Sequence, residues 1–267
     1  DNFGDAVELK GPLPIVGGTG SNAGATKEAG EPGGSFLFSV EPAGRSVWYR
    51  WEAVQSQWVT VDTCGSAFDT MLDVYAGSLP GPIAVVRNKE GPRADCGDGG
   101  SQVTFPAEAG TVYSIRVDGD LSPQPPDTIE GAFVLEVVPT PSPANDAFSS
   151  AQTVTAESLD NGGFFRVDVP GFNWNATKEA GEPGHGGDQG GASVWYSWTA
   201  PASGKADVVV SSWAFSSQLG THDRGLLGVY TGDSLGGLTS VGRPGFSAQE
   251  IKLDVVAGTT YRIAVDG

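Results

Sequence analysis

The heptapeptide Thr-Lys-Glu-Ala-Gly-Glu-Pro occurs twice in this chain, at 26–32 and again at 177–183. Ser-Val-Trp-Tyr-x-Trp follows both copies, at 46–51 and 193–198, and the segment 109–119 matches 257–267 in the same order. Matched segments at nearly constant spacing indicate a duplicated unit of roughly 145 residues, which is the size of a domain and not of a solenoid repeat. The duplication therefore predicts two domains of the same fold.

The composition favours short strands joined by tight turns. The 267 residues include 40 Gly and 18 Pro, and no long amphipathic helical pattern is present. The formal net charge of −17 creates a field that repels nucleic acid and anionic lipid, so we expect no nucleic-acid partner. No apolar run approaches the roughly 20 residues that a membrane-spanning helix needs, so we expect no membrane insertion.

Two cysteines, Cys64 and Cys96, fall in the first copy and have no counterparts in the second. A zinc site needs about four ligands, and nothing near these cysteines supplies the others. We therefore predict a disulfide, with a pair of free buried thiols as the alternative. A disulfide, together with a chain that opens at Asp1 without a signal peptide, leads us to expect a processed protein that is secreted or lies at the cell surface.

Alternating apolar residues predict strands in both copies, for example at 47–51 and 194–198, and at 113–117 and 261–265. Short strands of this kind, separated by Gly, Pro and Asp turns, are typical of β-sandwiches and jelly rolls. We predict an all-β chain of two tandem jelly-roll β-sandwich domains. The domains are expected at 1–138 and 145–267, joined by a semi-rigid, Pro-rich linker at 139–144.

The order of these motifs resembles the bacterial pre-peptidase C-terminal domain. The resemblance lies in the Asn-Asp-x-Phe-x-x-Ala opening at 145–151, the Val-Trp-Tyr-x-Trp strands, Phe-Asp-Thr-Met-Leu-Asp-Val-Tyr at 68–75, and Tyr-x-Ile-x-Val-Asp-Gly endings. That family is similar to the collagen-binding domains of clostridial collagenases. The resemblance implies a jelly-roll accessory module that tolerates or binds calcium and is not catalytic. The second copy departs from the pattern at 222–227.

One motif matches the nucleophile sequences of serine hydrolases. Gly232-Asp233-Ser234-Leu235-Gly236 fits both the GxSxG nucleophile elbow and the GDSL-type opening, but such hydrolases need a histidine after the serine. Both histidines, His185 and His222, precede Ser234, and each lacks a counterpart in the other copy. We interpret the motif as a turn after a strand, expect His185 to lie in a solvent-exposed loop, and predict that the chain is not an enzyme.

Calcium is the cofactor that the acidic, Gly-rich loops favour, because it takes carboxylate and carbonyl oxygens. The candidate ligands are the acids that recur in both copies, with Asp69 and Asp223 as a looser match. They are Asp1, Glu28, Glu31, Asp69, Asp118, Asp146, Glu179, Glu182, Asp223 and Asp266. The alternative is that these carboxylates cap turns and make the surface acidic.

Three tryptophans outside the repeated strands, Trp58, Trp174 and Trp213, are candidates for sugar stacking or for contacts between copies. Trp48 and Trp195 lie on the strand face opposite Val-Tyr-Trp and could also point outward. Burial in the sandwich core is the interpretation that we favour for each of these side chains.

The second copy stops at Gly267, where the first continues through a further strand at 133–138. Without that strand, the second domain would have an open edge and an apolar groove. We expect either that the natural chain continues or that another copy supplies the strand, which would join copies head to tail into an extracellular filament. The leading hypothesis is a structural or adhesive protein. The alternative is an accessory region of a secreted hydrolase that binds a polysaccharide or a collagen-like polymer.

Overall fold

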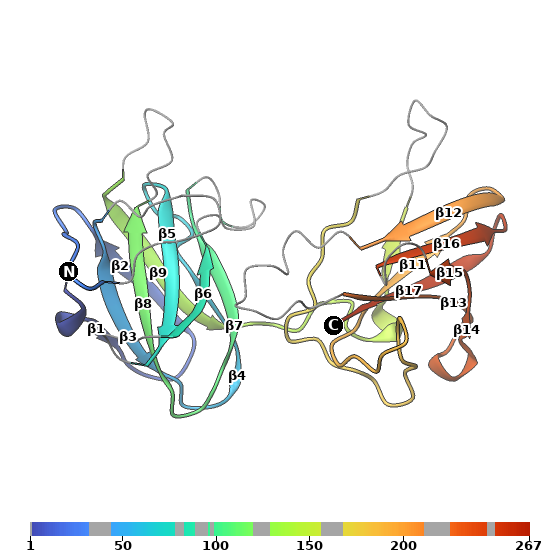
Figure 1. Cartoon of the computed structure of the whole chain (residues 1–267), viewed down its shortest axis with the longest axis horizontal. Coiled ribbons are helices and arrows are strands. Elements are labelled where there is room, and N and C mark those ends of the chain that lie inside the picture. The colour runs from blue at the N-terminus through green and yellow to red at the C-terminus, as the bar shows by residue number, and fades with distance from the viewer. Residues whose placement is uncertain are drawn as a thin grey trace. The chain divides into compact units, whose positions relative to one another are not determined.

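The computed structural model describes residues 2–31, 44–77, 83–88, 96, 99–119, 129–155, 168–210, 225–244 and 249–267. Two compact units are present: unit one runs to Thr140 and unit two begins at Pro141. In the described ranges the strands form four sheets, two in each unit (Figure 1). The predicted all-β sandwich class is confirmed.

Unit one packs a five-stranded sheet against a four-stranded sheet. The first has the order β1 (Val7–Leu9), β3 (Val47–Glu52), β8 (Val112–Gly119), β5 (Thr70–Ala76) and β6 (Ile83–Asn88). The second has the order β2 (Ile15–Ser21), β9 (Ala132–Pro139), β4 (Gln57–Asp62) and β7 (Gln102–Ala107). Among the described strands of unit one, only β1 pairs in parallel, beside β3, and the short 3₁₀ helix η1 (Phe3–Asp5) precedes it.

The core of unit one follows from the two-residue period of its strands, which sends alternate side chains to one face. Trp51 on β3, Ile115 on β8 and Leu135 on β9 belong to one buried cluster with Val61 and Phe105. Such apolar burial stabilises the unit by about 1.5–3 kcal/mol for each large side chain.

Unit two repeats this arrangement strand for strand over much of its length. Its first sheet has the order β10 (Gln152–Val154), β11 (Val194–Thr199), β17 (Thr260–Asp266), β13 (Leu226–Thr231) and β14 (Thr239–Ser240). The second has β12 (Gly204–Val209), β16 (Glu250–Val255) and β15 (Arg243–Pro244). The 3₁₀ helices are η2 (Phe148–Ser150) and η4 (Leu235–Gly237). Thus β11, β17 and β13 correspond to β3, β8 and β5, and β12 and β16 to β4 and β7.

Two predicted connections can be located. β9 extends to Pro139, and the N–H of Thr140 donates to the carbonyl oxygen of Trp58 at 2.9 Å, so the first residues of the predicted linker belong to the sheet of unit one. The Gly-Asp-Ser-Leu-Gly motif forms the turn between β13 and η4, where Ser234 precedes the first residue of the 3₁₀ helix.

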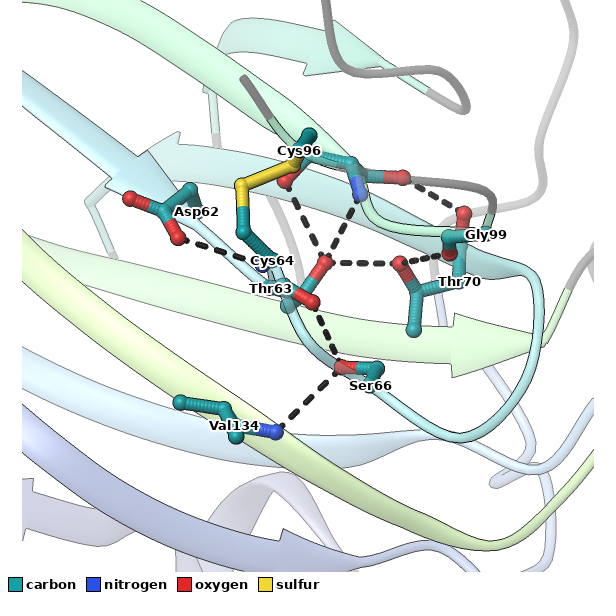
Figure 2. The surroundings of a disulfide bond; sticks show 9 residues. Asp62, Thr63, Cys64, Ser66, Thr70, Cys96, Gly99 and Val134 are labelled. Carbon is teal, nitrogen blue, oxygen red and sulfur yellow. Dashed lines mark hydrogen bonds between the residues drawn. A yellow bond between two sulfur atoms is a disulfide. The ribbon is translucent and has the colours of Figure 1, made fainter. Parts of the chain in front are cut away.

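The disulfide between Cys64 and Cys96 is confirmed, and it lies where β4 ends (Figure 2). The Thr63 hydroxyl is 2.6 Å from that of Thr70 on β5, and Ser66 donates to the Thr63 carbonyl oxygen at 2.6 Å. The covalent bond fastens the end of β4 to Cys96, which precedes β7, and the Thr63–Thr70 contact fastens it to the start of β5. Closing a loop with a sequence separation of 32 residues is worth about 3–4 kcal/mol on the loop-entropy model.

Asp62, at the end of β4, makes the stability of unit one depend on pH. Burial raises the pKa of its carboxyl, the Cys64 N–H lowers it, and the charge of Glu136, directly opposite on β9, raises it, with a net upward shift. A carboxyl whose folded pKa is raised stabilises the fold fully below its unfolded pKa. That contribution is lost as the pH rises through the folded pKa.

We expect Asp62→Asn to raise the unfolding free energy of unit one by about 0.5–1 kcal/mol at pH 7, because it removes a like-charge cross-strand pair. Near pH 3 the gain should vanish. Urea denaturation at the two pH values measures the effect, and Asp5→Asn, at an exposed acid in η1, is the control. An equal gain at both pH values would contradict this account.

Candidate functional site

The first glutamate of each heptad fastens the opening motif of its unit. The carboxylate of Glu28 accepts a hydrogen bond from the N–H of Phe3 in η1. In unit two, Glu179 accepts the N–H of Phe148 at 2.5 Å. Because free N–H groups at the start of a helical turn need an acceptor, the heptad carboxylate holds η1 and η2 in place.

The second glutamate directs one carboxylate oxygen to the backbone and the other into the interior. Glu31 Oε2 accepts the N–H of Glu28 at 3.1 Å, and Glu182 Oε2 accepts that of Glu179 at 3.0 Å. Glu31 and Glu182 are only 8% and 9% exposed. Each unit therefore buries a carboxylate at the same place, and a buried charge needs a partner.

In unit one the partners of this carboxylate are a tryptophan and an arginine, and the arginine is also paired with an aspartate. The Trp48 indole donates from Nε1 to Glu31 Oε1 at 3.1 Å. Arg116 on β8 is fully buried, with Nη1 at 3.8 Å from Glu31 Oε1 and Nε at 2.8 Å from Asp73 Oδ2. Asp73 on β5 lies directly opposite Arg116 in the strand register. The guanidinium thus serves two buried carboxylates.

Unit two lacks both members of that pair. The positions of Asp73 and Arg116 are taken by Gly228 on β13 and Ala264 on β17, which again lie opposite each other. A Cβ atom on Gly228 would lie 2.8 Å from Nδ1 of His185. Because Gly228 has no side chain, the imidazole occupies space that a larger residue would fill.

His185 is fully buried, so the prediction of an exposed loop histidine is wrong. Its Nε2 is 2.8 Å from Glu182 Oε1, and its Nδ1 is 2.7 Å from the Tyr230 hydroxyl. Trp195 contacts the ring edge to face, at a centroid distance of 5.5 Å. Trp48 and Trp195 are also buried, as favoured for them, and the outward orientation is excluded.

Tyr230 can act as a hydrogen-bond donor at neutral pH. Burial raises the pKa of its phenol, and the charges of Glu182 and Asp266 raise it further. The protonated hydroxyl donates to the carbonyl oxygen of Gly184 at 3.3 Å. Tyr230 thereby links the ring of His185 to the loop that carries it.

Asp118, at the end of β8, and Asp266, at the end of β17, bind the backbone just before β3 and β11. Asp118 Oδ1 accepts the N–H of Arg45 at 3.0 Å, and Asp266 Oδ1 accepts that of Ala192 at 2.8 Å. Burial alone raises the pKa of Asp266, but the N–H donors of Gly191, Ala192 and Gly267 and the Lys178 ammonium outweigh it. The pKa therefore lies below its usual value.

The structure brings some of the predicted ligands together. Among the described residues, one group of three or more His, Cys, Asp or Glu side chains places its ligand atoms within 4.8 Å of one another: Glu182, His185 and Asp266. Glu28, Glu31, Asp118, Asp146 and Glu179 accept backbone N–H groups individually. Asp69 is partly buried beside Gly99. Asp1 and Asp223 fall outside the described residues.

The three candidate tryptophans differ in their surroundings. Trp58 on β4 is half-buried, and Trp174 is half-buried and stacked on Phe172 at a centroid distance of 5.6 Å. Trp213 falls outside the described residues.

The sequence carried one signal for His185 that position-by-position comparison of the repeats could detect. Gly228 and Ala264 replace a pair that faces each other across two strands, so both charges disappear together. Paired losses of this kind indicate that another side chain occupies the vacated volume.

A double-mutant cycle in unit one tests whether Arg116 and Asp73 act as one unit. Arg116→Ala leaves two buried carboxylates without their cation, and we expect it to lower the unfolding free energy of unit one by about 3–5 kcal/mol. Asp73→Gly with Arg116→Ala, which copies unit two, should lose roughly 2 kcal/mol less than the sum of the single changes. Hydrogen exchange in peptides from β5 and β8 measures the effect, with peptides from β13 and β17 as the control. Additive losses would contradict the coupling.

No family model and no curated protein matches the chain. Two solved structures show distant likeness. One is CorA, a surface-associated copper-binding protein important in Methylomicrobium album BG8 copper acquisition. It has a TM-score of 0.33 and 10% identity over 51% of this chain and 98% of that one. The other is a cycloisomaltooligosaccharide glucanotransferase of Paenibacillus sp., with a TM-score of 0.26 and 9% identity over 94% of this chain and 44% of that one. Likeness at these TM-scores carries no argument about function.

Proposed function

We propose that the chain is a non-enzymatic, extracellular structural or adhesive protein of β-sandwich units, and that unit two accepts a β-strand from another copy along β12. The observation that carries this proposal is the edge of β12. Within the described residues β12 pairs with β16 on one side only, whereas its counterpart β4 lies between β7 and β9. Strand addition at a free edge is a common mode of protein association.

In unit one the edge of β4 that corresponds to the free edge of β12 is paired with β9. There β9 contributes Phe133, Leu135 and Val137, all buried, and β4 contributes Val59 and Val61, which are fully buried. The corresponding residues of β12 are partly exposed: they are Ala206 and Val208, with Val209 next to them 59% exposed. An incoming strand of alternating apolar residues would cover this surface.

The backbone of β12 is oriented to accept such a strand. The N–H of Val210 donates to the carbonyl oxygen of Gln249 at 2.9 Å, on the β16 side. Because successive residues of an antiparallel strand point to opposite sides, the N–H groups of Asp207 and Val209 face away from β16. Unpaired backbone groups along an edge are a template for another strand.

The Cys64–Cys96 disulfide supports the extracellular part of the proposal, since disulfides persist in oxidising compartments. The acidic charge of −17 suits a protein that remains dispersed until its edge is occupied. In the part of the chain that the structure describes, no helix is long and apolar enough to cross a membrane.

Asp207→Pro tests the edge directly. Proline removes the N–H that faces outward while leaving the β12–β16 hydrogen bonds in place, a position at which edge strands tolerate it. We expect it to abolish self-association of the full chain in light scattering, and to abolish binding of a synthetic peptide with the β9 sequence of residues 130–140.

Asp207→Ala is the matched control, because it also removes the ion pair with Lys252 but keeps the N–H. It should associate like the unmodified chain. An unmodified chain that stays monomeric at all concentrations and does not bind the peptide would contradict the proposal. So would cross-links showing that β12 pairs with a strand of the same polypeptide in material isolated from its source.

A second candidate function, binding of a polysaccharide, is favoured by the aromatic pair Phe172 and Trp174. The two rings are stacked with an interplanar angle of 26°, and Phe172 is 44% exposed. Exposed aromatic faces stack on sugar rings. This arrangement fits an accessory module of the kind that the resemblance to the pre-peptidase C-terminal domain implies.

We expect Trp174→Ala to reduce retention of the full chain in polysaccharide affinity electrophoresis at least about tenfold, in line with the loss of one stacking contact of roughly 1.4 kcal/mol. Trp58→Phe, on β4, is the control and should leave retention unchanged. Retention that is insensitive to Trp174 would exclude the aromatic pair as the binding surface.

A further inference from the structure

Three side chains of unit two that could ligate a metal converge in its interior: Glu182, His185 and Asp266. The side chains of all three are fully buried, and their ligand atoms lie within 4.8 Å of one another. We propose that they bind one divalent transition-metal ion of the zinc class. The site would be specific to unit two, because the equivalent region of unit one contains Arg116.

The donor atoms suit zinc better than calcium. One imidazole nitrogen and two carboxylate oxygens form a ligand set that zinc and related ions accept, with a solvent molecule as a fourth ligand. Calcium takes six to eight oxygens and has little affinity for imidazole. His185 Nε2 and Glu182 Oε1 are 2.8 Å apart, and they would separate by about half an ångström to reach the roughly 3.4 Å between two ligands of a tetrahedral zinc ion with bonds of about 2.0–2.2 Å.

Hydrogen bonds around His185 favour the tautomer that binds metals. When the Tyr230 hydroxyl donates to the Gly184 carbonyl oxygen at 3.3 Å, it accepts a hydrogen bond from Nδ1–H of His185 at 2.7 Å. Nε2 then presents its lone pair to the carboxylate oxygen of Glu182. A lone pair and an anion 2.8 Å apart need a cation between them, which is either a second proton on the imidazole or a metal ion. An imidazole held by its other nitrogen is the usual second shell of a zinc histidine.

Trp195 supplies an independent observation. Its Nε1 is buried and has no hydrogen-bond partner among the residues that the structure describes, whereas the equivalent Trp48 donates to Glu31 Oε1. In unit two the equivalent oxygen, Glu182 Oε1, contacts His185 Nε2 instead. Since a buried N–H without an acceptor is costly, a water bound to the metal would provide the acceptor that Trp195 lacks.

The local charges leave Glu182 in need of a cation. Ala264 stands where unit one has Arg116, and within the described residues no lysine or arginine forms an ion pair with Glu182. The Lys178 ammonium instead contacts Asp266 Oδ2 at 3.0 Å. Lys178 therefore competes with a metal ion for one ligand atom, and its removal should tighten metal binding.

The test is calorimetric titration of the full chain, after removal of metals with a chelator, with zinc chloride and separately with calcium chloride. We expect one zinc ion per chain, with His185→Gln weakening the affinity at least about tenfold. His222→Ala removes the only other histidine, and Glu31→Gln alters the same heptad position in unit one. Both controls should change the affinity less than about twofold.

Two further variants keep the test decisive if His185→Gln fails to fold. Tyr230→Phe keeps all three ligands but removes the orienting hydroxyl, and it should weaken zinc binding about tenfold. Lys178→Met should strengthen it several-fold. Cobalt substituted for zinc should give visible absorption bands that Tyr230→Phe shifts.

The proposal is overturned if zinc binds His185→Gln as tightly as the unmodified chain, or if no zinc binds. It is also overturned if nitrogen NMR in the presence of excess zinc shows that His185 Nε2 still carries a proton donated to Glu182. None of these measurements depends on whether β12 pairs with a strand from another copy, so the two proposals can fail separately.

Discussion

The structure depends on a carboxylate that both units bury, that of the second heptad glutamate. Glu31 and Glu182 each use one oxygen to hold the heptad backbone and the other to reach a partner inside the unit. A charge removed from water in this way is tolerable only when hydrogen bonds and an opposite charge surround it. The identity of that opposite charge therefore sets the composition of the neighbouring strands.

The two units meet this requirement with different side chains. Unit one places Arg116 on a strand and pairs it with Asp73 on the adjacent strand, so its cation is permanent. Unit two removes both residues and inserts His185 from a loop into the space above Gly228. An imidazole can present a proton or a lone pair to Glu182, whereas a guanidinium can only donate. Among the described residues, the partner of this carboxylate in unit two is thus a group whose proton can be removed.

Much of the fold follows from local sequence patterns. Period-two alternation located the strands that carry Trp51 and Ile115, and the repeat predicted the matching strands of unit two. The disulfide followed from there being two cysteines in one repeat. These features are predictable because backbone geometry and side-chain polarity determine them within a short segment.

The candidate site was less predictable because it depends on contacts between residues distant in sequence. His185 follows Gly184 in a Gly-rich loop, which is typical of exposed segments, yet it is buried by Trp195 and Tyr230 from two strands. Burial of Trp48 was the favoured interpretation and is confirmed, but alternation alone could not show that Phe3 of η1 packs against it. The heptad acids were predicted as calcium ligands, and in the structure Glu28, Glu31, Glu179 and Glu182 each accept a backbone N–H.

The anchoring of the heptad explains how its neighbourhood can diverge. Glu179 holds η2, and Glu182 Oε2 holds the N–H of Glu179, with no involvement of the strand residues beneath them. Oε1 contacts the residues that differ between the units, His185 in unit two and Arg116 in unit one. Because the backbone contacts keep the carboxylate in place, the group opposite it can change from guanidinium to imidazole without loosening the opening motif. A fixed carboxylate beside replaceable partners is the arrangement from which a metal site can arise in one copy of a repeat while the other retains an ion pair.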